Sequence, residues 1–161
     1  MDHSRIDDLT RFVARRTGRR SFATGIIGGL FATVTSGPGL PGTYRAWLAD
    51  ENESPSTRFI KNPGPYVLIN GTRIANNWTD LTDGSLLAPI NITESGGPPV
   101  GSPVWTGTLS SGNASTSTCT NWTSTSGNGV RGDSNATNAA WSNLLVTDCS
   151  IPRKLYCFQQ S

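Results

Sequence analysis

The stretch from residue 109 to residue 150 limits most strongly what this chain can fold into, because it is almost wholly Ser, Thr, Asn and Gly. Such a segment cannot bury enough apolar surface to fold by itself. It contains Cys119, Trp122, Trp141 and Cys149. We therefore expect the two tryptophans and a covalent link to fix the segment on the rest of the domain. A Cys119–Cys149 loop would be worth roughly 3 to 4 kcal/mol in the chain-entropy model.

The sequence from residue 35 onward predicts many short strands. Pro and Gly recur every few residues, and the segments between them are rich in β-branched and aromatic residues. We expect an α+β domain that is mostly β, with long loops. The predicted strands cover residues 44–48, 65–69, 72–75, 104–108 and 154–158, and residues 77–81 form one helical turn. Asn70-Gly71 predicts a hairpin in which both turn residues take positive φ.

Residues 1–34 have the character of an export leader. The apolar spacing over residues 4–13 predicts a short amphipathic helix. Arg19, Arg20 and Phe22 resemble the twin-arginine export signal, and the apolar run that follows is shorter than the about 20 residues of a membrane span.

We expect this leader to be cleaved, with membrane contact only during export. The product, residues 35–161, would be extracellular, on the cell surface or periplasmic. The alternative is a basic helix that packs on the domain or lies on anionic lipid.

Charge and histidine content exclude several functions. Residues 1–34 hold six of the thirteen basic and three of the eleven acidic residues, so the remainder has seven against eight, a net charge of −1. This balance makes nucleic acid an unfavourable partner. The one histidine, His3, lies in the leader, so the domain has no imidazole for catalysis or for a metal. We predict no enzyme, no catalytic residue and no cofactor.

Three cysteines in an exported chain predict one disulfide and one remaining sulfur. The carboxylate pairs Glu51 with Glu53 and Asp80 with Asp83 are the candidates for the alternative of a carboxylate-dependent hydrolase.

Several short motifs resemble, in their order, bacterial endostatin-like surface proteins such as the leptospiral ones. The chain is also similar to collagen endostatin, a variant of the C-type-lectin-like fold. The motifs are YRAWLAD at 44–50, Asn77-Trp78, VWTG at 104–107, Cys119-x-x-Trp122, Trp141, Cys149 and LYCF at 155–158.

The resemblance implies a C-type-lectin-like domain that lacks part of its N-terminal helical region. It implies that Cys119 pairs with Cys149, and that Cys157 loses its usual partner on an early helix. Cys157 would then be an unpaired, buried thiol or form an intermolecular bridge. The resemblance also implies an adhesion-type module for a protein ligand, such as an extracellular-matrix or plasma protein. Zinc and heparin binding do not carry over, because they need histidines and an arginine patch.

Three further features are candidate ligand sites. Trp105, Trp122 and Trp141 could stack on sugars, as in a glycan-binding lectin, although such rings are more often core. Arg131, Gly132 and Asp133 spell an integrin-recognition tripeptide, which we expect in an exposed polar loop, where Gly132 could equally serve a turn.

Oxygen ligands for Ca²⁺ are the last candidate, with solvated turn side chains as the alternative. They are Asp80, Asp83, Asn91 and Glu94. We therefore expect a protein or glycan ligand outside the cytoplasm and predict no oligomeric state.

Overall fold

The computed structural model describes the backbone of residues 11–16 and 34–35 and the complete residues 40–160. The export-signal residues Arg19, Arg20 and Phe22 lie outside the described residues. Two sheets and a few single-turn helices make up the described chain, so the expectation of a mostly β, α+β domain is confirmed.

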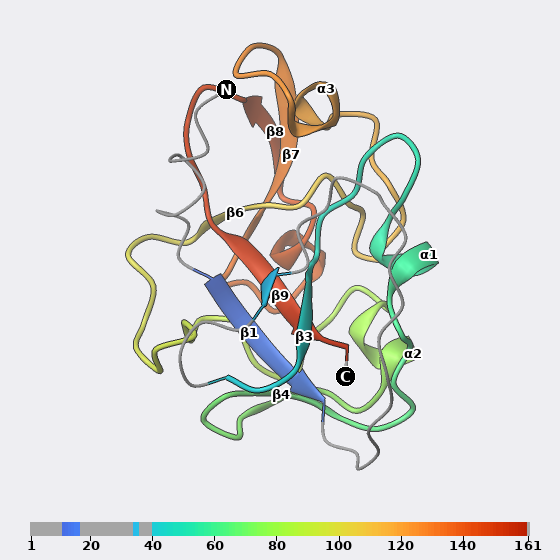
Figure 1. Ribbon diagram of the computed structural model, residues 1–161, viewed down its shortest axis with the longest axis vertical. Coiled ribbons are helices and arrows are strands. Elements are labelled where there is room, and N and C mark those ends of the chain that lie inside the picture. Colours follow the sequence, from blue (N-terminus) through green and yellow to red (C-terminus); the bar gives the residue numbers. More distant parts are fainter. Residues whose placement is uncertain (1–10, 17–33, 36–39, 161) are drawn as a thin grey trace.

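The larger sheet has six strands in the order β2-β3-β9-β1-β4-β5. They are β1 (Arg11–Arg16), β2 (Val34–Thr35), β3 (Thr43–Ala46), β4 (Tyr66–Leu68), β5 (Arg73–Ala75) and β9 (Leu155–Gln159). β3 and β9 are antiparallel, with Arg45 opposite Phe158. Figure 1 shows β3, β9 and β1 close together in the centre of the ribbon. The strands predicted at residues 44–48 and 154–158 are confirmed as β3 and β9.

β1 lies within the range expected to be leader. It pairs in parallel with β9 and antiparallel with β4, so that Ala14 lies opposite both Phe158 and Leu68. The helix predicted over residues 4–13 is therefore wrong for residues 11–13. Two neighbouring strands bond the backbone on both sides here, and such tertiary pairing overrides a short helical pattern.

The predicted hairpin at Asn70-Gly71 is confirmed as β4 and β5. Only Gly71 takes positive φ, at +88°, so the expectation of two positive φ values is wrong. The Gly71 N–H donates to the Leu68 carbonyl at 2.9 Å, which closes a turn one residue longer than expected. A three-residue hairpin loop of this kind needs left-handed backbone only at its last residue.

The smaller sheet has the order β6-β7-β8, all antiparallel. Its strands are β6 (Pro103–Trp105), β7 (Asn128–Asp133) and β8 (Leu145–Asp148). The sequence predicts β6 but neither β7 nor β8, because both lie in the polar stretch. Gly129 of β7 illustrates why the sequence pattern does not show this strand. A Cβ at residue 129 would come within 2.6 Å of the Cys119 sulfur, so packing requires glycine, which has a low strand propensity.

Each helix is a single turn. They are α1 (Pro55–Arg58), α2 (Trp78–Leu81), α3 (Cys119–Trp122) and the 3₁₀ turn η2 (Ala139–Trp141). α2 confirms the helical turn predicted at residues 77–81, and the Asn77 side chain caps it by accepting from the Asp80 N–H. No helix in the described part of the chain has the length and apolar character to cross a membrane.

The main core joins the two sheets through aromatic rings. Trp47 follows β3 and packs on Trp141 with ring centroids 4.8 Å apart. Both indoles have no exposed surface, and Phe158 of β9 lies 5.5 Å from Trp47. Burying a ring of this size removes about 150 to 250 Å² from water. The expected role of Trp141 as an anchor of the polar stretch is confirmed.

A buried hydroxyl network fixes the polar stretch beside these rings. Trp47 Nε1 donates to Ser142 Oγ at 2.8 Å, and Ser142 Oγ lies 2.6 Å from Thr108 Oγ1. Thr106 Oγ1 donates to the Ser142 carbonyl at 2.6 Å. These hydroxyls are buried, where polar groups cost free energy unless they are hydrogen-bonded. The network therefore favours one arrangement of the segment.

The disulfide joins Cys119 and Cys149, as the resemblance implies. It closes a loop with a sequence separation of 30, which contains the whole of β7 and β8. Cys157 is buried in β9, outside this disulfide.

We expect the double change Cys119→Ala with Cys149→Ala to lower the free energy of unfolding by about 3 to 4 kcal/mol, because the unfolded loop regains its entropy. Urea denaturation measures this difference. The reductant dithiothreitol should destabilise the natural protein by a similar amount and leave the double variant unchanged. Equal stability of the natural protein with and without reductant would contradict the prediction.

Candidate functional site

Four consecutive residues of α3 have left-handed backbone. Their φ angles are +51° at Cys119, +54° at Thr120 and Asn121, and +62° at Trp122. Each such residue costs roughly 1 to 2 kcal/mol unless it is glycine. Strain of this kind persists only where the surroundings enforce it.

Side-chain anchors on either side hold this left-handed turn. Cys119 is held by the disulfide, and Trp122 Nε1 donates to the Ala49 carbonyl at 2.8 Å. Asn121 Oδ1 accepts from the Glu51 N–H at 3.0 Å. Trp122, a candidate ligand residue, is half-buried and packs on Trp105 with centroids 5.6 Å apart. The indole N–H and one part of its ring are thus committed to structural contacts.

Thr120 is exposed, so a substitution there changes few side-chain contacts and reports mainly on the left-handed backbone. We expect Thr120→Gly to be about 1 kcal/mol more stable than Thr120→Ala in urea denaturation, because only glycine adopts this φ without strain. The same pair at Thr123, where φ is −99°, is the control, and there alanine should be at least as stable as glycine. The same order of stability at both positions would contradict a left-handed turn.

Arg131, Gly132 and Asp133 lie in β7, so the prediction of an exposed loop is wrong. Gly132 is buried, and a Cβ there would come within 2.0 Å of the Trp141 carbonyl oxygen. This close packing requires glycine at residue 132, a constraint that the sequence alone does not show. The tripeptide is therefore extended along β6, and Arg131 also pairs with β8, so that it is not displayed at a turn.

Two of the proposed calcium ligands, Asp80 and Asp83, accept hydrogen bonds within local turns. Asp80 Oδ2 accepts from the Asn76 N–H at 2.6 Å and from Asn76 Nδ2 at 2.9 Å. Asp83 Oδ1 accepts from the N–H and hydroxyl of Ser85 at 2.8 and 3.0 Å. Within the described residues no group of three or more His, Cys, Asp or Glu side chains could hold a metal ion, and Asp80, Asp83 and Glu94 are not gathered into one.

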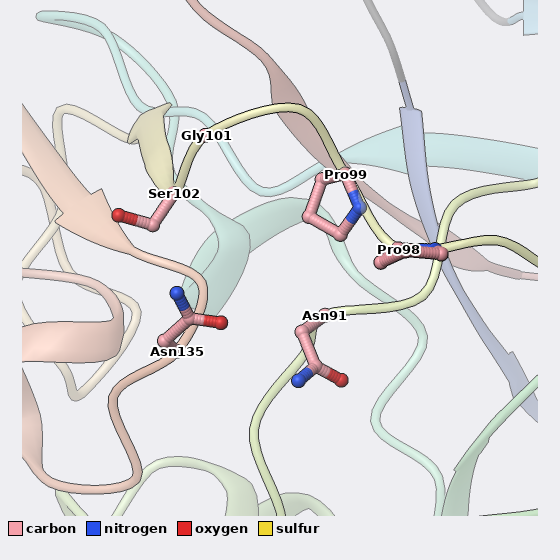
Figure 2. A pocket seen from close by; sticks show the side chains of 6 residues that line it. All are labelled: Asn91, Pro98, Pro99, Gly101, Ser102 and Asn135. Atoms are coloured by element: carbon pink, nitrogen blue, oxygen red, sulfur yellow. The ribbon is translucent and has the colours of Figure 1, made fainter.

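A shallow pocket of about 290 Å³ lies between the loop before β6 and Asn135, which follows β7. Its lining is uncharged and consists of Asn91, Pro98, Pro99, Gly101, Ser102 and Asn135. Figure 2 shows the amide oxygen of Asn135 directed toward the space that Asn91 and Pro99 border. Of the calcium candidates, Asn91 alone lines this pocket.

Backbone bonds fix the walls of the pocket. The Ser134 N–H donates to the Ser102 carbonyl at 2.9 Å, and the Thr93 N–H donates to the Gly97 carbonyl at 2.8 Å. Lys154 Nζ donates to the Gly101 carbonyl at 2.7 Å and also to the Val100 carbonyl. Burial lowers the pKa of the Lys154 ammonium. The pocket is therefore preformed.

A second feature is an apolar surface along β8, which we call the β8 surface. It consists of Leu144, Leu145, Val146 and Ile151, which are 40 to 52% exposed. These are four of the eight large apolar side chains that the described residues expose. Figure 1 shows β8 at the periphery of the ribbon, near α3. Leu145 and Val146 are neighbours in a strand, so their side chains point to opposite faces of the sheet, and the β8 surface includes both sides of this edge. Exposed apolar side chains that gather at one place are typical of an interaction site.

Two arginines flank the β8 surface. The Arg153 guanidinium lies 5.0 Å from the centroid of the Trp105 ring, and its Nη2 is 3.5 Å from Thr147 Oγ1. Burial lowers the pKa of Arg153, and repulsion from Arg131 lowers it further. In the sequence these arginines are separated by η2 and β8, so no local pattern could have predicted their proximity.

Neither a family model, nor a curated protein, nor a solved structure matches this chain. Both surfaces are therefore interpreted from their own geometry and chemistry.

Proposed function

We propose that this chain is an exported, non-catalytic binding module of the endostatin-like, C-type-lectin-like kind, which binds a protein ligand through the β8 surface. The observation that carries the proposal is that residues 144–151 hold half of the large apolar side chains that the described residues expose. Removal of apolar surface from water is the main favourable contribution to most protein–protein association.

Two observations support export and the absence of catalysis. A disulfide such as Cys119–Cys149 persists mainly in oxidising compartments. Residues 35–161 contain no histidine, and the carboxylates of Asp80 and Asp83 accept hydrogen bonds from their own turns. A glycosidase instead needs two carboxyl groups that face each other across a cleft, one with a raised pKa.

A panel of purified extracellular-matrix and plasma proteins tests the proposal by biolayer interferometry. We expect at least one protein to bind the full chain and to bind the double variant Leu145→Ser with Val146→Ser at least about tenfold more weakly, because an interface loses the burial of two apolar side chains. Leu87→Ser is the matched control, since Leu87 is 57% exposed and lies outside the β8 surface. An absence of binding, or equal loss in both variants, would overturn the proposal.

A glycan ligand is the second candidate, and the pocket at Asn91 and Asn135 favours it. Amide and hydroxyl groups beside proline rings provide hydrogen bonds and apolar contact without charge, which suits a neutral sugar.

We expect any glycan bound on an array to bind equally with and without Ca²⁺, because no carboxylate lines the pocket. The double variant Asn91→Ala with Asn135→Ala should lose that binding at least about tenfold, since it removes both amides. Asn143→Ala, at an exposed position outside the pocket, should retain it. Calcium-dependent binding would argue against this pocket.

A further inference from the structure

β8 is a sheet edge without the usual protection. β2 is an edge of only two residues, and β5 is covered where the Leu87 N–H donates to the Ile74 carbonyl. β6 is covered where the Trp105 N–H donates to the Lys154 carbonyl. β8 has four residues, no Lys or Pro, and among the described strands pairs with β7 alone. Natural sheets usually block such edges, because an exposed edge pairs readily with another extended segment.

The N–H and C=O groups of Val146 point away from β7. Val146 lies opposite Val130. The Val130 N–H donates to Ser117, and the Val130 carbonyl accepts from Thr106, so both groups are directed toward the β6 side. Opposite residues of an antiparallel pair alternate between exchanging two hydrogen bonds and exchanging none. Val146 is therefore in a pair that exchanges none, and its N–H and C=O face the outer edge.

The two arginines place positive charge on one face of this edge. Arg131 lies opposite Trp105 on one side and Leu145 on the other, so these side chains share a face with Thr147. Within the described residues neither Arg131 nor Arg153 forms an ion pair, and Arg153 Nε is buried without an acceptor. A carboxylate would supply the missing acceptor and reduce the repulsion between the two guanidinium groups.

We propose that the ligand of the β8 surface is an extended acidic peptide segment that adds to β8 as a fourth strand, with a carboxylate bound by Arg131 and Arg153. This inference rests on the proposed function of that surface. Main-chain bonds to Val146 give register, and the apolar side chains give contact area. An added strand lies about 10 Å from β7, two strand spacings, which a long acidic side chain and an arginine together span.

A second copy of this chain fits the edge less well. The acidic residue of β8 is Asp148, which is two residues from Val146 and so on the opposite face from Arg131 and Thr147. Antiparallel pairing of two β8 strands about a two-fold axis normal to the sheet keeps each face on its own side. Such a dimer would leave the guanidinium groups without a carboxylate.

The probe for the test is a short synthetic peptide in which Val alternates with Glu, labelled with fluorescein and titrated with the full chain. We expect it to bind at least about tenfold more tightly than the same peptide with Gln in place of Glu. The variant Arg131→Gln with Arg153→Gln should remove this preference. Equal binding of the two peptides to the natural protein would overturn the proposal.

Val146→Pro is the decisive variant, because proline removes only the outward N–H and is tolerated at such an edge position. We expect it to weaken peptide binding at least about tenfold, whereas Val146→Ala, which keeps the N–H, should retain binding. Hydrogen exchange gives a readout that needs no variant: the Val146 amide should exchange rapidly in the free protein and slowly with peptide bound.

The results that would overturn strand addition differ from those that would overturn the proposed function. Equal binding by Val146→Pro and Val146→Ala, an unchanged Val146 amide, or a dimer that Val146→Pro dissolves would overturn strand addition. Protein binding that Leu145→Ser with Val146→Ser removes, together with no peptide binding, would leave the proposed function standing and overturn this inference alone.

Discussion

The contact between Trp47 and Trp141 makes one core out of two sheets. Trp47 follows β3 of the larger sheet, and Trp141 ends the turn that leads to β8 of the smaller one. Their packing brings the Ser142 hydroxyl to the Trp47 indole N–H, which starts the buried network with Thr106 and Thr108. The polar segment thus contributes one large ring and several small hydroxyls in place of an apolar face. Its fold depends on partners outside itself.

Local signals in the sequence predicted local structure well. The elements that were not predicted depend on contacts between residues far apart in the sequence. The Asn70-Gly71 turn, the Asn77 cap and the strand at residues 155–159 follow from short-range chemistry. β7 escaped prediction because Gly132 is set by the Trp141 backbone, which is close in space. β1 escaped because its partners are β4 and β9. The arginine pair at the β8 surface could not be predicted for the same reason.

The left-handed turn at Cys119 to Trp122 shows how this domain uses strain. Its backbone costs free energy, and the disulfide, the Trp122 indole and the Asn121 amide together offset that cost. These anchors tie the turn to the loop after β3. The disulfide also reaches Cys149 at the end of β8. The strand that carries the exposed apolar side chains is therefore held at its end by a covalent bond.

A rigid, uncovered strand suits recognition by strand addition, since little conformational entropy is lost at the protein's side of the interface. The composition of the domain leads to the same conclusion. Residues 35–161 have few charges, and the described residues expose only eight large apolar side chains, so side chains alone offer limited means of recognition. Backbone hydrogen bonding at Val146 is independent of composition, and two arginines beside it are enough to select for acidic segments. A polar β domain can in this way gain specificity from one edge.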